Sequence, residues 1–223
     1  MSLKLFFETI IKFLLGVVLI GLLIFLPAGT LNYFNGWLFM IVLFVPMFIA
    51  GIVMMIKNPS LLASRLDAKE TQKEQGIVIK LSGLMFVVGF ILAGLDFRYG
   101  WIKLPSWLPY IFAILFILGY ILFGFVLKQN TYLSRTIKVE EGQTVVDTGL
   151  YGVVRHPMYM ATLLMFLSMP LILGSLVSFF VFLMYPILIG IRAVNEEKLL
   201  EKELKGYKEY KQKVKYRIIP FIW

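Results

Sequence analysis

The feature that most constrains this chain is an uncharged stretch that extends over residues 157–191. As one α-helix with a rise of 1.5 Å per residue it would be about 52 Å long, whereas the hydrocarbon core of a bilayer is about 30 Å thick. Pro170 and Gly174 interrupt the stretch near its middle. It therefore predicts a hairpin of two short membrane helices with a turn at residues 173–175, and Pro186 should bend the second helix.

Four further stretches have the length and apolar character of single membrane spans. Hydrophobic residues make up 60% of the sequence and charged residues 16%, compared with about 45–50% and about 25% in soluble domains. The expected spans are residues 5–26, 36–56, 77–95 and 107–127. The sequence thus predicts an all-α integral membrane protein with about six transmembrane helices, the last two a short helical hairpin followed by a cytosolic amphipathic helix.

Positive charge is distributed unevenly between the two sides of these spans. Of the 22 Lys and Arg residues, Lys12 and Lys80 lie in span ends and only Arg98 and Lys103 fall on one side, which leaves 18 on the other. Cytoplasmic loops are the ones enriched in Lys and Arg. This bias predicts a multi-pass protein of a bacterial or archaeal cytoplasmic membrane with both termini in the cytoplasm. The orientation in the membrane and contact with membrane lipids thus account for the net charge of +9. No nucleic-acid partner is expected.

Two residue counts restrict the chemistry. The sequence has no cysteine and a single histidine, His156, which excludes disulfides, thiolate nucleophiles and the His/Cys zinc sites that need several such ligands. No metal site is expected. We expect one integrated domain, in which residues 1–128 form an N-terminal four-helix region and residues 129–223 form a catalytic region with a cofactor loop, the hairpin and a cytosolic tail.

The loop that leads into the hairpin has an unusual choice of residues. Gly149 and Gly152 permit close backbone approach, and an Arg155-His156 pair stands at the mouth of the hairpin, where free backbone N–H groups of a helix start can bind an acceptor. Tyr151 and Tyr159 lie close to this pair in the sequence. These residues form a candidate site, although interfacial residues that face lipid headgroups would have the same composition.

A second candidate group follows the hairpin directly. Arg192 and Glu196 are four residues apart, so on a helix they share a face. The guanidinium could bind a substrate carboxylate, and the carboxylate could accept hydrogen bonds from an ammonium group. A solvated ion pair worth a few tenths of a kcal/mol is the alternative.

Together the two groups resemble the isoprenylcysteine carboxyl methyltransferase and phospholipid methyltransferase superfamily of integral-membrane enzymes. The resemblance covers roughly residues 130–223. The motifs that carry it are Gly149-x-Tyr151-x-x-x-Arg155-His156-Pro157-x-Tyr159, then Arg192-x-x-x-Glu196-Glu197-x-x-Leu200 and Tyr207-x-x-Tyr210.

The resemblance implies S-adenosylmethionine as cofactor and S-adenosylhomocysteine as product. It implies that the carboxylate of the substrate binds Arg192, which is also a candidate catalytic residue together with Glu197. The cofactor contacts that it implies come from the loop, from the start of the first hairpin helix and from the segment after the second: Gln143, Thr144, Val145, Val146, Tyr151, Arg155, His156, Pro157, Met158, Tyr159 and Glu196.

The expected function is therefore methyl transfer from S-adenosylmethionine to a lipophilic acceptor that enters from the bilayer, such as the carboxylate of an isoprenylcysteine-like or prenylated substrate. Three alternatives stay open. A lipid amine N-methyltransferase would need a base, for which His156 or Glu197 is a candidate. An NADPH-dependent membrane sterol or enone reductase resembles the same C-terminal region. A transporter or non-catalytic membrane scaffold would use Arg155 and Arg192 only as interfacial residues.

Overall fold

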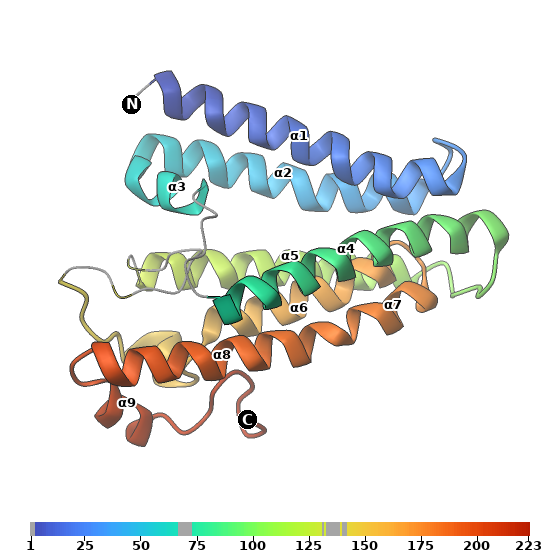
Figure 1. Cartoon of the computed structure of the whole chain (residues 1–223). Coiled ribbons are helices and arrows are strands. Elements are labelled where there is room, and N and C mark those ends of the chain that lie inside the picture. Colours follow the sequence, from blue (N-terminus) through green and yellow to red (C-terminus); the bar gives the residue numbers. More distant parts are fainter. Residues whose placement is uncertain (1–2, 67–72, 131, 133–138, 140–141) are drawn as a thin grey trace.

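The computed structural model describes residues 3–66, 73–130, 132, 139 and 142–223. Within these ranges the chain is helical apart from loops and one isolated β-bridge between Val154 and Tyr216 (Figure 1). The prediction of an all-α integral membrane protein is confirmed. The four expected single spans are α1 (Leu3–Ala28), α2 (Phe34–Lys57), α4 (Lys73–Tyr99) and α5 (Leu108–Gln129).

The charge-free stretch forms the expected hairpin. Its first arm is α6 (Pro157–Ile172) and its second is α7 (Leu176–Phe182) followed by α8 (Met184–Glu203). Gly174 makes the turn with a φ of +76°, and the Ser175 hydroxyl caps α7 by accepting a hydrogen bond from the Ser178 N–H.

The second arm is interrupted at Leu183, between α7 and α8. Pro186 explains this bend, because it has no N–H to donate to the carbonyl of Phe182 and its ring would clash with that carbonyl in a straight helix. Both the turn and the bend are confirmed. Among the described residues, five helical segments are long and apolar enough to cross a membrane if α7 and α8 are taken together, and α6, with 16 residues, is shorter.

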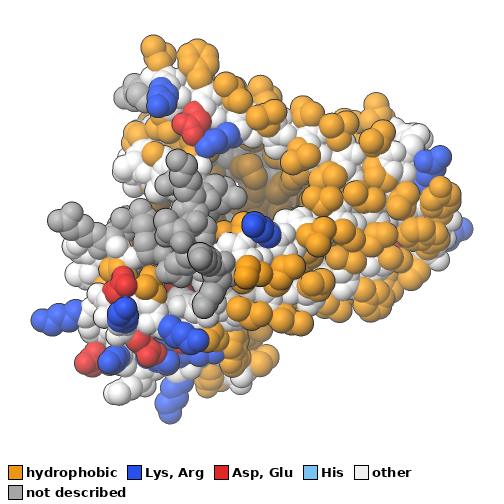
Figure 2. Space-filling model, in the orientation of Figure 1, with side chains coloured by type: hydrophobic (Ala, Val, Ile, Leu, Met, Phe, Trp, Pro, Cys, Tyr) orange, Lys and Arg blue, Asp and Glu red, His pale blue; other side chains and the backbone are white. Residues whose placement is uncertain are grey.

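The helix pair α1–α2 packs on the rest of the bundle from the α1–α2 turn as far as Leu43 near the middle of α2, whose carbonyl accepts a hydrogen bond from the Tyr120 hydroxyl of α5 at 2.9 Å (Figure 1). Near the turn a Cβ added to Gly94 of α4 would lie 2.5 Å from the carbonyl oxygen of Ile24, so glycine permits the contact. The Tyr33 ring stacks on Phe97 with 4.0 Å between centroids, and its hydroxyl donates to the carbonyl of Leu173 in the hairpin turn. Toward the other end α1 and α4 diverge, and the surface between them is hollowed and lined by hydrophobic side chains (Figure 2).

The polar groups of the fold gather at the end where α1 and α4 diverge. This end carries α3 (Pro59–Leu66), the 3-10 helix η1 (Gly149–Gly152) and α9 (Tyr207–Lys213). Charged side chains cluster over α9 and the end of α8, whereas hydrophobic side chains cover most of the membrane-spanning surface (Figure 2). The polar end of the hairpin therefore meets the aqueous side of the molecule here.

The sequence assigned no function to the connector between α2 and α4, part of which lies outside the described residues. The structure places its Arg65 beside the hairpin: the guanidinium lies 3.9 Å from the sulfur of Met158 and 5.5 Å from the centroid of the Phe123 ring. The connector therefore supplies a cation close to the start of α6.

Candidate functional site

A cavity opens at the polar end, between the end of α5, the loop before α6, and the last turns of α8. It encloses about 800 Å³, counting its open mouth. Most of the residues predicted for the site line it: Gln143, Thr144, Val145, Val146, Tyr151, Arg155, His156, Met158, Tyr159, Arg192 and Glu196. Pro157 and Glu197 do not. The two sequence blocks, far apart in the chain, thus form one site.

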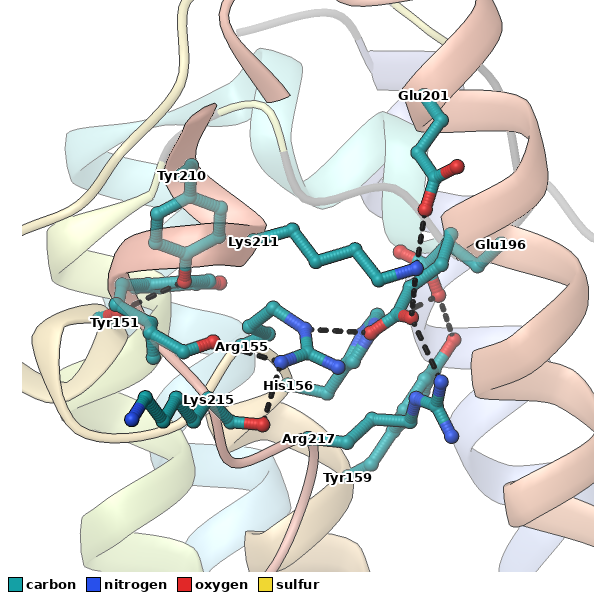
Figure 3. A network of polar contacts seen from close by, with 12 residues as sticks. Tyr151, Arg155, His156, Tyr159, Glu196, Glu201, Tyr210, Lys211, Lys215 and Arg217 are labelled. Atoms are coloured by element: carbon teal, nitrogen blue, oxygen red, sulfur yellow. Dashed lines mark hydrogen bonds and ion pairs between the residues drawn. The ribbon is translucent and has the colours of Figure 1, made fainter. Parts of the chain in front are cut away.

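The membrane side of the cavity carries a chain of polar contacts centred on Tyr159, in the first turn of α6 (Figure 3). The Tyr159 hydroxyl donates to the Glu196 carboxylate and accepts from Nε of Arg192 at 3.2 Å. Since both α8 residues contact one hydroxyl, the prediction that Arg192 and Glu196 share a helix face is confirmed.

His156 extends this series of polar contacts toward the interior of the protein. Its ring stacks on Tyr159 with 5.2 Å between centroids and 12° between planes, and its Nδ1 lies 3.9 Å from Glu196 Oε2. Its Nε2 lies 3.2 Å from Glu197 Oε1. The imidazole is therefore held between two carboxylates, one in the cavity wall and one behind it.

Glu197 is the centre of a buried ion cluster behind the cavity wall. Its side chain is 2% exposed, and its two oxygens contact Nε of Arg155 at 2.7 Å and a terminal nitrogen of Arg217 at 3.0 Å. Lys211, which also pairs with Glu201, lies 3.6 Å away (Figure 3). Because a buried charge is tolerated only when it is paired and hydrogen-bonded, these contacts hold the carboxylate in place.

A strap, defined here as residues 214–218, runs alongside the start of α6. The Arg155 guanidinium donates to the carbonyls of Val214 and Lys215, both at 2.7 Å. The backbone N–H of Arg155 donates to the backbone carbonyl of Tyr216, and the N–H of His156 donates to the carbonyl of Arg217. The strap and Glu197 together fix the backbone and side chain of Arg155, and with them the position of His156 in the cavity wall.

The aqueous side of the cavity is aromatic and aliphatic. The rings of Tyr207 and Tyr210 meet edge to face at 5.6 Å and pack with Leu204, and Val145 joins the same cluster. Tyr210 donates to the carbonyl of Tyr151 at 2.8 Å. Burial raises the pKa of the Tyr151, Tyr207 and Tyr210 hydroxyls, so these three phenols stay neutral at physiological pH.

The cavity thus combines an apolar, ring-lined end with a polar end that carries Arg192, His156 and Glu196. Rings can stack on a planar base, and guanidinium groups bind anionic oxygens. In the described part of the chain, no group of three His, Asp or Glu side chains is placed to hold a metal ion. The arrangement suits an organic cofactor with an aromatic and a charged part.

The family model for the ergosterol biosynthesis ERG4/ERG24 family matches residues 2–223. The chain belongs to this family. It is 32% identical over 125 residues to the Delta(14)-sterol reductase TM7SF2 of Mus musculus, an alignment that covers 50% of this chain and 30% of that protein. It is 29% identical over 93 residues to the Delta(14)-sterol reductase of Methylotuvimicrobium alcaliphilum, over 40% of this chain and 22% of that one. The matched segments therefore span less than a third of either relative.

Family membership corrects the functional prediction. The assignment to the isoprenylcysteine carboxyl methyltransferase superfamily was wrong, as were the methyltransferase activity and the S-adenosylmethionine cofactor, because the matching family and both relatives are of the sterol reductase type. The structure gives a physical reason for the error. Arg155 and Glu197, on which the resemblance partly depended, bind each other and the strap, so their pattern indicates a scaffold and does not identify the bound cofactor.

Sequence reasoning missed the contribution of the strap and of Asn130, whose amide donates to the Tyr151 hydroxyl at 3.2 Å. A signal for the strap was present. Arg217 stands in an otherwise apolar segment, Tyr216-Arg-Ile-Ile-Pro220. A cation in such surroundings requires a buried carboxylate partner, and Glu197 is that partner.

Proposed function

We propose that this chain forms a reductase site that adds hydrogen across a carbon–carbon double bond of a sterol-like lipid, with NADPH as the reductant. Family membership and the names of both relatives support the reaction class. The observation that carries the proposal is the position of the Tyr159 hydroxyl, which contacts Arg192 and Glu196 where the membrane hairpin meets the cavity. A proton donor at this depth can reach a substrate that stays in the bilayer.

The residues of the cavity fit a dinucleotide. The aqueous end of the cavity offers tyrosine rings for a base, and Arg192 offers a cation for anionic oxygens. NADPH, when bound, supplies a hydride. The residues that would hold it are Tyr207 and Tyr210 at the aqueous end and Arg192 and His156 at the membrane end.

Reduction of a double bond also consumes a proton, which the protein must deliver to the second carbon. Tyr159 is the proposed donor, because it lines the cavity and its hydroxyl contacts both Arg192 and Glu196. The phenolate left behind would be neutralised by the guanidinium of Arg192. A new proton would reach Tyr159 through Glu196, with His156 Nδ1 as the next polar group at 3.9 Å.

The substrate would enter sideways from the membrane. The hollow between α1 and α4 opens on the bilayer-facing surface at the end that carries the cavity (Figure 2), and apolar side chains line it. We further propose that both termini face the cytoplasm, from the Lys/Arg bias, and that residues 1–128 form the membrane scaffold on which residues 129–223 build the site.

The proposal is tested with the purified protein in lipid nanodiscs. NADPH binding is measured by calorimetry, with S-adenosylhomocysteine as the negative control, and turnover is measured as NADPH oxidation on a sterol with a Δ14 double bond. Tyr159→Phe should lower turnover by about 100-fold or more, since a general acid contributes about 10²–10⁴-fold, and should leave NADPH affinity unchanged.

Tyr185→Phe is the matched control. Tyr185 does not line the cavity, and its hydroxyl donates to Thr162 at 2.8 Å, so its loss should change turnover only slightly. Absence of NADPH binding to the unmodified protein would refute the proposed function. Full turnover in Tyr159→Phe would refute the assigned proton donor alone.

A further inference from the structure

The residues that follow the strap form a closed turn with an exposed apolar surface. In this hook, defined as residues 219–223, the N–H of Ile222 donates to the carbonyl of Ile219, and the N–H of Ile219 donates to the carbonyl of Trp223. The turn leaves the side chain of Phe221 85% exposed and that of Ile222 77% exposed. Two large apolar side chains therefore project from a well-defined backbone turn.

The backbone of the hook is held in an unfavourable conformation. Phe221 has a φ of 65°, a left-handed conformation that side chains with a Cβ rarely adopt. Among the residues that the structure describes it is the one non-glycine residue with positive φ. Such strain persists where surrounding interactions compensate for it. Within the protein the Phe221 ring contacts only the edge of its surroundings: it lies 5.2 Å from the Tyr216 ring, and most of the residue stays exposed.

The position of Trp223 fixes the depth of the hook. A Cβ added at Gly190 of α8 would lie 3.3 Å from the Trp223 ring, so the hook is seated on α8 two residues before Arg192, inside the uncharged stretch. The neighbouring Ile187 is 65% exposed on the same helix, within a segment long and apolar enough to cross the membrane. The apolar surface of the hook is thus continuous with the lipid-facing surface of α8.

The surroundings of the hook carry positive charge. The Arg217 guanidinium lies 4.5 Å from the centroid of the Trp223 ring, and Lys215, which precedes the hook, is exposed. Tryptophan rings beside basic residues are typical of the membrane–water interface. Apolar tips with adjacent cations also match a surface that contains anionic lipid.

We propose that the hook inserts into the interfacial region of the bilayer beside α8, in the leaflet on the side of the cavity. Lipid would then cover Phe221 and Ile222, and their burial would offset the strain at Phe221. The insertion would also anchor the strap from its far end, because Arg217 contacts both Trp223 and Glu197. This membrane contact does not depend on the identity of the reaction.

The absence of cysteine from the sequence allows a test with a single label. An environment-sensitive fluorophore is attached to Ile222→Cys, to Ile187→Cys as a lipid-facing reference, and to Lys208→Cys on α9 as an aqueous reference; all three side chains are exposed, so labelling should not disturb packing. The proteins are placed in nanodiscs of zwitterionic and anionic phospholipid, with and without lipids that carry a quencher in the upper part of the acyl chain.

The label at position 222 should show a blue-shifted emission and lose fluorescence with the quencher lipids, as at position 187, whereas the label at 208 should do neither. Emission at 222 equal to that at 208 would overturn the proposal. A blue shift at 222 without quenching would also overturn it, because it would place the hook against protein, such as a second copy of the chain.

Discussion

Glu197 offers the sharpest test of how the site is held together. The side chain is buried and faces Arg155, Arg217, His156 and Lys211, yet it does not line the cavity. We therefore expect Glu197→Gln to act mainly on stability. Glutamine keeps an oxygen that can accept a hydrogen bond, but it removes the negative charge that balances the buried guanidinium of Arg155.

The magnitude follows from the burial of the partners. Removing one partner of a buried ion pair costs about 3–5 kcal/mol. The Arg155 side chain is buried but keeps its two carbonyl acceptors in the strap, and Arg217 and Lys211 are partly exposed and can recover solvation. We therefore expect Glu197→Gln to lower the free energy of unfolding by about 3 kcal/mol, the lower end of this range.

Glu201→Gln is the matched control on the same helix. Its carboxylate also pairs with Lys211, but its side chain is 32% exposed, so the loss should be below about 1 kcal/mol. The free energy of unfolding of each variant is measured by titration with a denaturing detergent, with NADPH affinity measured in parallel under native conditions. Turnover of both variants is measured as NADPH oxidation. Equal losses of stability in the two variants would refute the structural role of Glu197. Normal stability in Glu197→Gln combined with lost turnover would also refute it, because it would indicate a direct chemical role.

Two further pairs of variants test the packing. Gly94→Ala should destabilise the protein by about 1–3 kcal/mol, because the new Cβ would meet the Ile24 carbonyl. Gly83→Ala on the same helix is the control: its new Cβ would have nothing within 4 Å, so thermal unfolding should be unchanged. An unchanged unfolding temperature in Gly94→Ala would contradict the close contact. Tyr207→Phe removes a buried hydroxyl without a partner in the described structure and should leave stability unchanged or raise it. Tyr210→Phe breaks a hydrogen bond to the Tyr151 carbonyl and should lower stability by about 0.5–1.5 kcal/mol. If thermal unfolding showed Tyr207→Phe to be less stable than Tyr210→Phe, these hydrogen-bond assignments would be refuted.

The membrane helices could be predicted from the sequence because apolar length decides them almost alone. The hairpin was also predictable, since no single span could accommodate its uncharged stretch, and Pro186 marked the bend. The divergence of α1 from α4 could not be predicted in this way. It depends on where a glycine such as Gly94 allows close contact, which is a tertiary property.

The location of the candidate site was more predictable than its chemistry. Arg192 and Glu196 were placed together by helical spacing, and Tyr159 by its position at the helix start. The reaction class was not encoded in these residues, because a carboxylate, a guanidinium and a phenol serve methyl transfer and reduction equally well. Arg217 was overlooked because its partner is 20 residues away in sequence, beyond the reach of any local periodicity.

The length of α6 has a consequence for the depth of the site in the membrane. With 16 residues and a rise of 1.5 Å each, the helix is about 24 Å long, some 6 Å less than an average hydrocarbon core. A bilayer adapts to a short element by thinning around it. No residue of α6 is exposed, however, so the neighbouring helices separate it from lipid and the bilayer can keep its full thickness there. Any part of the shortfall that falls at the start of α6 would then set how deeply a lipid-borne substrate must lie to reach Tyr159.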